Sequence, residues 1–405
     1  MKHPSAVRVL VTYGWCRTAY VVAESLAKAG YAVYGCDDSR WNMLSCSRHV
    51  RGFDVVSNPF RNPRQFVSDL ASVVRKRKID ILLPVHEDVL AVAQFRDLLP
   101  QDTVVIAPRH EDLLLAVDKC EIIRVAGRAG VPSPRTFEPR TAQEVAAAAR
   151  ELSGPLILKT RRGNSGKGVI FVKSPAEAGG LWKHLIRRFR LPAGREPLVQ
   201  EYLEGDLYGS CFLASEGEIK GLFLEKYLRW KDGKFGTSVL REPSSWELLG
   251  DYTRQIVREL RWTGIGHLDF TGRQHENRAW LLEMNPRFWG ALNMAVQNGY
   301  DFPLGLVSMY QRSEPEAVAF SPRMRQRKSV WIVGELIAGL EGTRGGNLAA
   351  ILSSLGRILL PPSAAGYDDF RWGDPLVLAG EMVQYLSRFW RSGLSMNPVI
   401  DEMMQ

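Results

Sequence analysis

A glycine-rich, basic segment runs from Lys159 to Gly168 and reads Lys-Thr-Arg-Arg-Gly-Asn-Ser-Gly-Lys-Gly. Its three glycines let backbone N–H groups approach an anion, and the neighbouring Lys and Arg side chains supply positive charge. The segment does not match a Walker A loop, because Gly168 stands where Ser or Thr should follow Lys167, and Arg161 stands where the first glycine should be. Apolar residues on both sides predict a strand–loop–strand hairpin. The segment is a candidate phosphate-binding loop, although an ordinary tight hairpin explains it equally well.

Asp269, Glu283, Asn285 and Arg287 form a second group of residues that could do chemistry. If the strands that carry them pair across the intervening turn, Asp269 lies near Glu283, and Asn285 projects to the same side as Glu283. Two carboxylates and an amide oxygen are hard ligands that suit Mg²⁺. Arg287 would then be available for a developing negative charge. Taken alone, however, acidic residues at strand ends are more often simply solvated.

The distribution of charge along the chain suggests that the two groups belong to one site. Residues 1–200 carry 31 Lys and Arg against 19 Asp and Glu, residues 201–310 carry 12 against 15, and residues 311–405 carry 10 of each, which gives the net charge of +9. A basic phosphate loop followed ~100 residues later by an oxygen-only metal site is the composition of a nucleotide–Mg²⁺ site. The positive first half would face phosphates, and the acidic segment would face the metal.

The composition argues against several classes of function. The five Cys and seven His show no metal-ligand or disulfide spacing, and no apolar stretch reaches the ~18–20 residues of a membrane helix. The one basic run, residues 75–78, ends a predicted helix and is interpreted as solvated, so no nucleic-acid partner is expected. We expect a cytoplasmic protein without a transmembrane segment.

The first 110 residues predict a doubly wound α/β domain, because strands and helices alternate along them. The first strand–helix turn, Tyr13–Thr18, holds only one glycine, so it does not match a dinucleotide-binding loop despite Asp37 and Asp38 downstream. Predicted strands cover Val7–Thr12, Tyr31–Gly35, Ile79–Val85 and Val104–Ala107, and predicted helices cover Ala19–Lys28, Phe66–Lys78 and Val89–Leu98.

Residues 111–310 predict a mixed α+β arrangement with antiparallel sheets. One helix is expected over Asp112–Gly130, followed by a rigid Pro-containing connector. Residues 311–405 change character and predict a mostly helical extension, with helices near 330–341, 346–358 and 376–390. Strands are expected over Leu156–Thr160, Val169–Lys173, Val199–Leu203, Ser210–Ala214, Gly221–Tyr227, Gly266–Phe270 and Ala279–Glu283.

These motifs, in this order, resemble the ATP-grasp superfamily, most closely its carboxylate–amine ligases of the amino-acid and peptide type. The resemblance covers about residues 7–310. It rests on Asp118-Lys119 with the Gly130–Pro134 connector, on Leu156–Lys159 with the loop 163–168, on Val199–Asp206, and on the Glu-x-Asn-Pro-Arg run at 283–287. It implies a domain at 1–110, two ATP-grasp subdomains at 111–200 and 201–310, and a C-terminal extension at 311–405.

The resemblance also implies roles for individual residues. ATP is expected on Lys119, Lys159, Gly163, Asn164, Ser165, Gly166, Lys167, Gly168, Glu201, Tyr202, Leu203 and Asp206. Mg²⁺ or Mn²⁺ is expected on Asp269, Glu283 and Asn285, with Arg287, Lys226 and Arg229 as catalytic residues and Glu87, Arg241 and Trp289 as substrate contacts. For Glu87, Lys226, Arg229 and Arg241, a surface ion pair is an equally good interpretation.

The implied activity is the ATP-dependent activation of a carboxylate as an acyl phosphate, followed by transfer to an amine. The alternatives are an ATP-grasp enzyme with another acceptor, such as a carboxylase or a phosphotransferase, and a catalytically weak nucleotide-binding regulator. Leu207 departs from the pattern, because the family often has a Glu there for the ribose, and Asp206 is the candidate substitute.

The partners expected are a small-molecule carboxylate and an amine. Aromatic residues of the C-terminal extension predict a helical cap over the core or a dimer interface, with an interfacial membrane face as the alternative. They are Trp331, Phe370, Trp372, Tyr385, Phe389 and Trp390, accompanied by Arg388 and Arg391.

Overall fold

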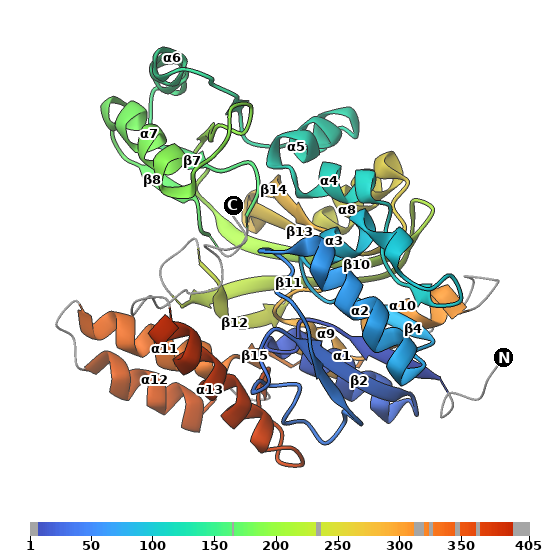
Figure 1. Ribbon diagram of the computed structural model, residues 1–405. Helices are drawn as coiled ribbons and strands as arrows, with labels where there is room; N and C mark the ends of the chain where they lie inside the picture. Colours follow the sequence, from blue (N-terminus) through green and yellow to red (C-terminus); the bar gives the residue numbers. More distant parts are fainter. Residues whose placement is uncertain are drawn as a thin grey trace.

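A computed structural model describes residues 7–163, 166–231, 236–311, 320–323, 327–344, 349–361 and 365–391. Three sheets organise these residues, and helices cover their faces (Figure 1). None of the helices in these ranges is long and apolar enough to cross a membrane.

The first sheet is parallel throughout and has the order β3-β2-β1-β4-β5, as the alternating pattern predicted. The chain places β2 and β3 on one side of β1 and then returns to place β4 and β5 on the other side. In such sheets, ligands bind at the carboxyl ends of the strands where the order changes sides, here between β1 and β4. The strands are β1 (Arg8–Val11), β2 (Ala32–Asp37), β3 (Phe53–Val55), β4 (Ile81–Leu83) and β5 (Val104–Val105), and the helices are α1 (Arg17–Lys28), α2 (Pro63–Arg77), α3 (Val89–Gln94) and the 3-10 turn η2 (Arg96–Leu98).

The second sheet is antiparallel and has the order β6-β9-β7-β8. The predicted hairpin around the glycine-rich segment is confirmed as the β7–β8 pair, in which Lys159 lies opposite Val169. Two helices pack on this sheet and enclose its own small core. The elements are β6 (Thr136–Phe137), α6 (Ala142–Leu152), β7 (Leu156–Lys159), β8 (Val169–Val172), η3 (Pro175–Glu177), α7 (Ala178–Phe189) and β9 (Leu198–Glu201).

The third sheet has seven strands in the order β14-β13-β10-β11-β12-β15-β16. All its pairs are antiparallel except β15 with β16, and these two short strands come from the C-terminal part of the chain. The sequence predicted neither of them, nor β12. The elements are β10 (Asp206–Ser215), β11 (Glu218–Trp230), β12 (Ser238–Pro243), α8 (Glu247–Leu260), β13 (Gly264–Arg273), η4 (Gln274–Glu276), β14 (Arg278–Asn285), β15 (Ser329–Val330) and β16 (Gly366–Tyr367).

The single helix expected over Asp112–Gly130 is wrong. The structure has two helices, α4 (His110–Val117) and α5 (Lys119–Arg128), which meet at Asp118. Asp118 leaves the helical region, with φ −83° and ψ 111°, and its carboxylate accepts hydrogen bonds from the N–H groups of Cys120 and Glu121. An Asp at this position caps the second helix, and the break places Lys119 at its first residue.

The remaining helices follow the third sheet along the chain, and the three expected in the C-terminal extension are present. Figure 1 shows α11, α12 and α13 grouped beside β12 and β15. These helices are α9 (Leu292–Gln297), α10 (Phe302–Gln311), α11 (Ile332–Arg344), α12 (Ala349–Leu359) and α13 (Leu376–Arg391).

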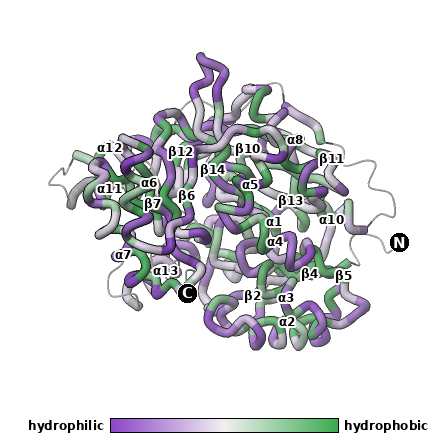
Figure 2. Tube along the Cα trace, turned by 90° about the horizontal axis from the view of Figure 1, so that it is seen from above, coloured by the Kyte–Doolittle hydropathy of each residue, from purple (hydrophilic) through white to green (hydrophobic). Residues whose placement is uncertain are grey.

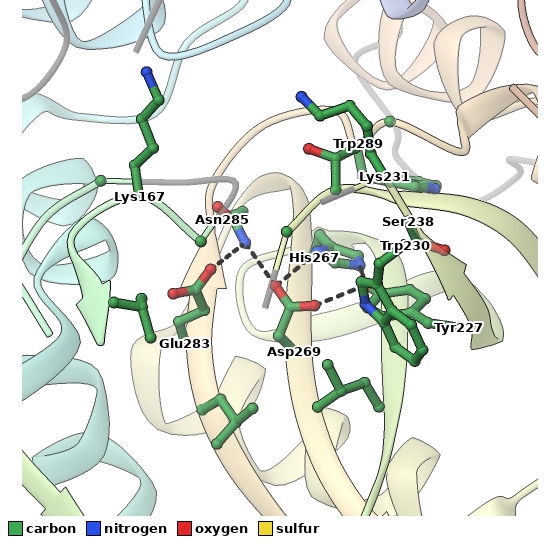
Figure 3. A pocket seen from close by; sticks show the side chains of 18 of the residues that line it. Lys167, Tyr227, Trp230, Lys231, Ser238, His267, Asp269, Glu283, Asn285 and Trp289 are labelled. Carbon is green, nitrogen blue, oxygen red and sulfur yellow. Dashed lines mark hydrogen bonds and ion pairs between the residues drawn. The ribbon is translucent and has the colours of Figure 1, made fainter. Parts of the chain in front are cut away.

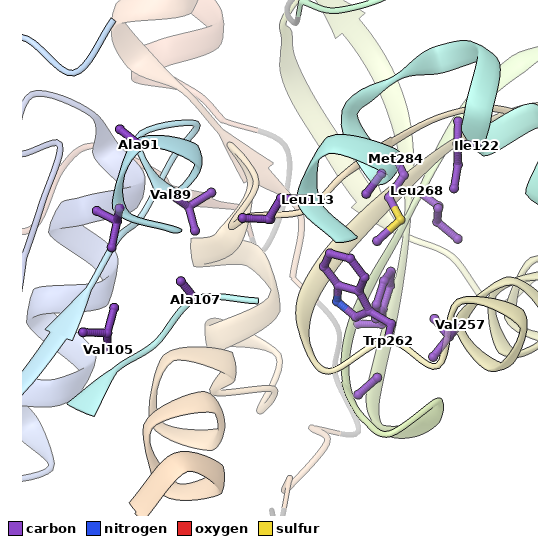
Figure 4. Packing of buried hydrophobic residues seen from close by; sticks show 14 of the residues in the cluster. Val89, Ala91, Val105, Ala107, Leu113, Ile122, Val257, Trp262, Leu268 and Met284 are labelled. Atoms are coloured by element: carbon purple, nitrogen blue, oxygen red, sulfur yellow. The ribbon is translucent and has the colours of Figure 1, made fainter. Parts of the chain in front are cut away.

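One hydrophobic cluster joins the first and third sheets. It extends from Val89 and Leu113, beside the first sheet, to Trp262 and Met284 beside the third (Figure 4). In the tube view, apolar residues follow the strands of both sheets through the interior (Figure 2). This shared packing fixes the two sheets relative to each other, which allows them to build one site between them.

Candidate active site

A cavity of about 320 Å³ lies among the three sheets. The first sheet contributes the turns after β1 and β4, the second contributes β7, β8 and β9, and the third contributes β10 to β14. Trp331, which lies just before α11, and two residues of α13 complete the lining. A concave site of this size with polar groups from several elements suits a small-molecule ligand.

Two buried lysines meet at one end of the cavity. The Lys119 Nζ donates to the carbonyl oxygen of Gly163 over 2.6 Å and lies 3.0 Å from the Glu283 Oε2. The Lys159 Nζ donates to the carbonyl oxygen of Leu282 over 3.2 Å. These contacts join the start of α5, the end of β7 and strand β14. They hold two cations beside a single carboxylate, which leaves a positive balance suited to phosphate.

The electrostatics of this cluster follow from burial and from the paired lysines. Burial, together with the neighbouring Lys119, lowers the pKa of Lys159 to about 7. Burial alone would raise the pKa of Glu283, but Lys119 and Lys159 outweigh it and hold that pKa below its ordinary value. Glu283 is therefore ionised at neutral pH, as a metal ligand must be.

The predicted pairing of Asp269 with Glu283 is present in the β13–β14 register. The Asn285 Nδ2 donates to the Asp269 Oδ2 over 3.0 Å and to the Glu283 Oε1 over 3.4 Å (Figure 3). The Tyr227 hydroxyl donates to the other oxygen of Asp269 over 2.7 Å. Burial, reinforced by Glu283 and opposed by His267, raises the pKa of Asp269. The two carboxylates thus converge on a hydrogen-bond donor, as they would on a cation.

Arg287 follows this cluster and is held in place by three acceptors. Its Nε donates to the Glu87 Oε1 over 2.7 Å, its Nη1 to the carbonyl oxygen of Phe288 over 2.8 Å, and its Nη2 to the Asn285 Oδ1 over 3.3 Å. Glu87, which was expected to contact substrate, instead contacts this guanidinium from the turn after β4. The guanidinium lines the cavity at the edge of the carboxylate cluster.

Most of the described residues that were expected to bind the nucleotide line the cavity, and Leu207 lines it too. The expected residues in the lining are Lys119, Lys159, Gly163, Gly166, Lys167, Glu201, Tyr202 and Leu203. Gly168 forms the base of the hairpin, where its carbonyl oxygen accepts from the Thr160 N–H over 3.0 Å. Gly163, Gly166 and Gly168 have φ values of 118°, 74° and 72°, which favour glycine. Asn164 and Ser165 lie outside the described residues.

Three of the predicted site residues form ion pairs and do not line the cavity: Lys226, Asp206 and Arg229. Lys226 alternates with the inward-facing Glu225 and Tyr227, and its Nζ lies 2.7 Å from the Asp206 carboxylate. Arg229 pairs with the buried Glu335 of α11. Strand β11 has irregular register on both sides of Arg229, which lets Trp230 and Lys231 line the cavity instead. For these residues the ion-pair interpretation fits the geometry.

Arg241 and Trp289, both expected to contact substrate, do line the cavity and are buried. Arg241 Nη1 lies 3.5 Å from Asp368, and Arg17 Nε lies 3.9 Å from the same carboxylate. Asp368 belongs to the segment between α12 and α13, and the Ser329 hydroxyl donates to it. The C-terminal part of the chain therefore helps to position two arginines at the site.

The sequence did not predict the cavity residues contributed by the two ends of the chain. Tyr13, Trp15 and Arg17 come from the turn after β1, whose place at the end of a central strand could have indicated them. Tyr13 has φ 58°, unusual for a bulky residue, and stacks on His86 with 4.6 Å between ring centroids. At the opposite end of the chain, Trp331 and Tyr385 were among the aromatic residues that predicted a helical cap or a dimer interface, but no motif placed them or Glu381 at the site.

Comparison with protein-family models finds none that matches the chain. Among curated proteins, the chain is similar to a formate-dependent phosphoribosylglycinamide formyltransferase from Bacteroides fragilis, with 22% identity over 292 residues. That alignment covers 68% of this chain and 74% of the relative.

Solved structures give a fold-level comparison. The chain resembles the biotin carboxylase domain of 2-oxoglutarate carboxylase from Hydrogenobacter thermophilus, solved with MgADP, ADP and bicarbonate, with 16% identity, a TM-score of 0.63, and coverage of 76% of this chain and 70% of that one. It also resembles an L-amino acid ligase from Bacillus licheniformis, with 14% identity, a TM-score of 0.61, and coverage of 78% and 77%. At these identities the likeness concerns the fold.

Proposed function

We propose that this chain, which has the ATP-grasp fold, is an ATP-dependent ligase that activates a carboxylate as an acyl phosphate and joins it to an amine. One observation carries the proposal. Two buried lysines, a converging pair of carboxylates with Asn285, and the guanidinium of Arg287 line a single cavity, although they come from the start of α5, from strand β7 of the second sheet and from β13, β14 and the residues after β14. The L-amino acid ligase among the similar structures supports the same class of reaction.

ATP would lie along the second sheet in this proposal. Lys119 and Lys159 would hold its phosphates, together with the backbone N–H groups of the loop at Gly163–Gly168. The segment Glu201–Leu203 would hold the base, because its backbone borders the cavity beside apolar Ile157 and Val169. The related carboxylase domain binds ADP, according to its description, and this supports the assignment.

Asp269 and Glu283 fit Mg²⁺ or Mn²⁺, because their two carboxylates already converge on one donor. Asn285 would join them through its amide oxygen after its side chain turned over, since that oxygen now accepts from Arg287. A divalent ion supplies charge stabilisation to phosphate oxygens when it is bound there. Lys119 keeps Glu283 ionised, and the Tyr227 hydroxyl restrains Asp269 by donating a hydrogen bond to its Oδ1. The neighbouring side chains thus prepare both carboxylates for this role.

In the proposed reaction, a carboxylate oxygen of the acid attacks the γ-phosphorus, the bond to the β-phosphate oxygen breaks, and ADP leaves. The amine nitrogen then attacks the acyl carbon, a proton leaves the nitrogen, and the carbon–oxygen bond to phosphate breaks. Arg287 would stabilise the negative oxygen that develops on the acyl carbon. Glu87 and the Phe288 carbonyl fix the direction in which Arg287 points, so little reorganisation is needed.

The test incubates the protein with Mg-ATP and a pooled library of acids and amines, and follows ADP, phosphate and product mass. Arg287→Ala should lower amide formation by about 10²- to 10³-fold and leave ATP affinity nearly intact. Arg278→Ala is the matched control, because Arg278 is exposed at the start of β14. Full turnover in Arg287→Ala would show that its assigned role is wrong.

A second candidate is an ATP-grasp enzyme that uses another small acceptor, such as bicarbonate or formate. Bicarbonate in the related carboxylase domain and the name of the formate-dependent relative favour it. ADP release that depends on bicarbonate or formate, and not on the acid–amine library, would select this candidate. Tight ATP binding with no acid-dependent turnover would instead favour a nucleotide-binding regulator.

A further inference from the structure

The part of the cavity beyond Arg287 has an aromatic wall made of Tyr13, Trp15, Trp331 and Tyr385. Their rings form a continuous series, with centroid separations of 5.6 Å for Tyr13–Trp15, 5.8 Å for Trp15–Tyr385 and 6.2 Å for Trp331–Tyr385. Trp15 and Tyr385 are only half-buried and line the cavity. They leave aromatic surface for a ligand to cover.

Two arginines meet between this wall and Arg287. A Cβ placed on Gly290 would lie 2.5 Å from the Arg17 Nη2 and 3.5 Å from the Arg241 Nη2, so both guanidiniums converge where only a glycine leaves room. The Arg241 Nη1 is buried and donates no hydrogen bond within the described part of the chain. The two guanidiniums share the Asp368 carboxylate, which lies 3.9 Å from the Arg17 Nε and 3.5 Å from the Arg241 Nη1, so the group keeps one positive charge that suits a carboxylate ligand.

Neighbouring indoles add hydrogen-bond donors to the same space. Trp230 and Trp289 both line the cavity, and the Nε1 of each is buried without a hydrogen-bond partner among the residues described. Trp289 is 2% exposed, so its N–H has no access to bulk water. Figure 3 shows Trp230 beside Tyr227 and Asp269. A ligand with both flat apolar faces and oxygen or nitrogen acceptors would satisfy this lining.

A phosphorylated sugar suits this space less well than a carboxylate, because Arg17 and Arg241 together with Asp368 carry a net charge of only one, whereas a phosphate carries up to two negative charges. The Arg17 guanidinium lies 3.9 Å from the centroid of Trp331 and pairs with Asp368. The Arg388 guanidinium lies 4.7 Å from the centroid of Trp15 and pairs with Asp38. A doubly charged phosphate needs several donors that it does not share with carboxylates.

We infer that the acid activated by this protein is an aromatic carboxylate. Its ring lies against Trp15 and Tyr385, and its carboxylate lies between Arg241 and Arg287. This inference rests on the proposed ligase function and specifies its substrate class. It separates this chain from the formyltransferase relative, whose name specifies a phosphoribosyl substrate.

The experiment uses hydroxylamine as the acceptor, which removes the need to know the natural amine. The acyl carbon of the acyl phosphate gains a bond to the hydroxylamine nitrogen, the nitrogen loses a proton, phosphate leaves, and a hydroxamate forms. The full-length protein receives Mg-ATP and one acid at a time, from benzoate, phenylacetate and indole-3-acetate to acetate, formate and succinate. We expect kcat/KM for at least one aromatic acid to exceed that for acetate by about 10-fold or more.

Two variants of α13 test whether the wall is responsible. Tyr385→Leu should raise KM for the aromatic acid about 10-fold and should raise KM for acetate by a smaller factor, because acetate has no ring to lie against the tyrosine. Trp390→Leu is the matched control, because Trp390 lies on the same helix but is 72% exposed, and it should leave both unchanged. An equal effect of both variants, or no effect of Tyr385→Leu, would overturn the inference.

Failure of the inference differs from failure of the proposed function. Hydroxamate from acetate, formate or succinate at the same or higher kcat/KM than from every aromatic acid would overturn the inference and leave the ligase function intact. If no acid gave ADP or hydroxamate, the ligase function would fail. Saturation-transfer NMR of phenylacetate with the protein and a non-hydrolysable Mg-ATP analogue would then decide the inference directly, because binding supports it and absence of binding overturns it.

Discussion

The two halves of the cavity differ in how the chain builds them. The half proposed to bind the nucleotide, called the nucleotide half below, contains Lys119, Lys159, Asp269, Glu283 and Asn285, which lie at a helix start and on strands that are paired as hairpins. The half proposed to bind the acid, called the substrate half, brings the turn after β1 together with residues from the C-terminal region. In the first half, local spacing along the chain places the side chains. In the second, residues more than 300 positions apart must meet.

This difference has an electrostatic counterpart. In the nucleotide half, the amino groups of Lys119 and Lys159 lie beside Glu283, and this pair of amino groups suits an anionic ligand. In the substrate half, Asp368, Asp369 and Glu381 are all buried near Arg17 and Arg241. Burial raises the pKa of Glu381 well above its ordinary value, with Asp369 contributing and Arg17 opposing. In the substrate half, buried carboxylates of the protein therefore pair with the arginines, whereas in the nucleotide half we propose that the lysines bind a ligand.

The largest effect should come from the nucleotide half. Glu283→Gln removes a metal-ligating charge and the partner of Lys119, so turnover should fall about 10³-fold, or about 4 kcal/mol of transition-state stabilisation. The Mg²⁺ concentration needed for half-maximal ADP release should also increase. Glu276→Gln, in the turn between β13 and β14, is the control and should change neither quantity. Unchanged Mg²⁺ dependence in Glu283→Gln would contradict the metal assignment.

The next effect concerns the stability of the substrate half. Burial raises the pKa of Asp369 to about 6, with Asp368 adding to the shift and the N–H groups of Ile332 and Val333 opposing it. The folded state then binds the proton more tightly than the unfolded state. The free energy of unfolding should therefore decrease as pH rises from about 4 to about 6, by about 3 kcal/mol from this group.

Asp369→Asn tests that contribution, because an amide loses no proton and its oxygen can still accept from the start of α11. Relative to the wild type, the variant should gain stability over the same pH range, measured by chemical denaturation at pH 4, 5, 6 and 7.5. Asp251→Asn is the control, because Asp251 is exposed on α8. Parallel pH profiles for the wild type and Asp369→Asn would exclude this source of pH dependence.

A smaller effect is expected where the substrate half contacts the acid. Arg241→Gln should lower kcat/KM for the acid about 30-fold, or about 2 kcal/mol, by removing a charged hydrogen-bond donor. Affinity for Mg-ATP, measured by calorimetry, should change by less than about 2-fold, because Arg241 lies away from the two lysines. A loss of Mg-ATP affinity equal to the loss of kcat/KM would show that the two halves are not separable in this way.

The smallest effect is expected on the opposite face of the same strands. Lys226 pairs with Asp206 outside the cavity lining, so Lys226→Gln should leave kcat/KM within about 2-fold of the wild type. The steady-state assay used for Arg241→Gln measures both variants side by side. A large loss of activity in Lys226→Gln would restore the catalytic role that the sequence suggested for it.

The two kinds of region were not equally predictable. Alternation of strands and helices predicted the first sheet, and the spacing of Asp269, Glu283 and Asn285 predicted that they share one side of paired strands. The resemblance implied a catalytic role for Arg229, but register shifts in β11 bring Trp230 and Lys231 to the cavity lining and leave Arg229 paired with Glu335. The capping geometry of Asp118 was visible as an Asp followed by Glu121, yet the continuous apolar pattern around it predicted one helix.

The sequence alone predicted most of the strands and helices, the β7–β8 hairpin around the glycine-rich loop and the pairing of Asp269 with Glu283, because each depends on neighbours within one hairpin or one helix. Only the tertiary structure decided that Arg17, Arg241, Trp331 and Tyr385 face one cavity. Their meeting depends on where strands β15 and β16 join the third sheet and on how α13 packs against the turn after β1. Such contacts form because side chains are buried and paired with buried charges. Neither requirement fixes a spacing along the chain, so no sequence pattern indicates them.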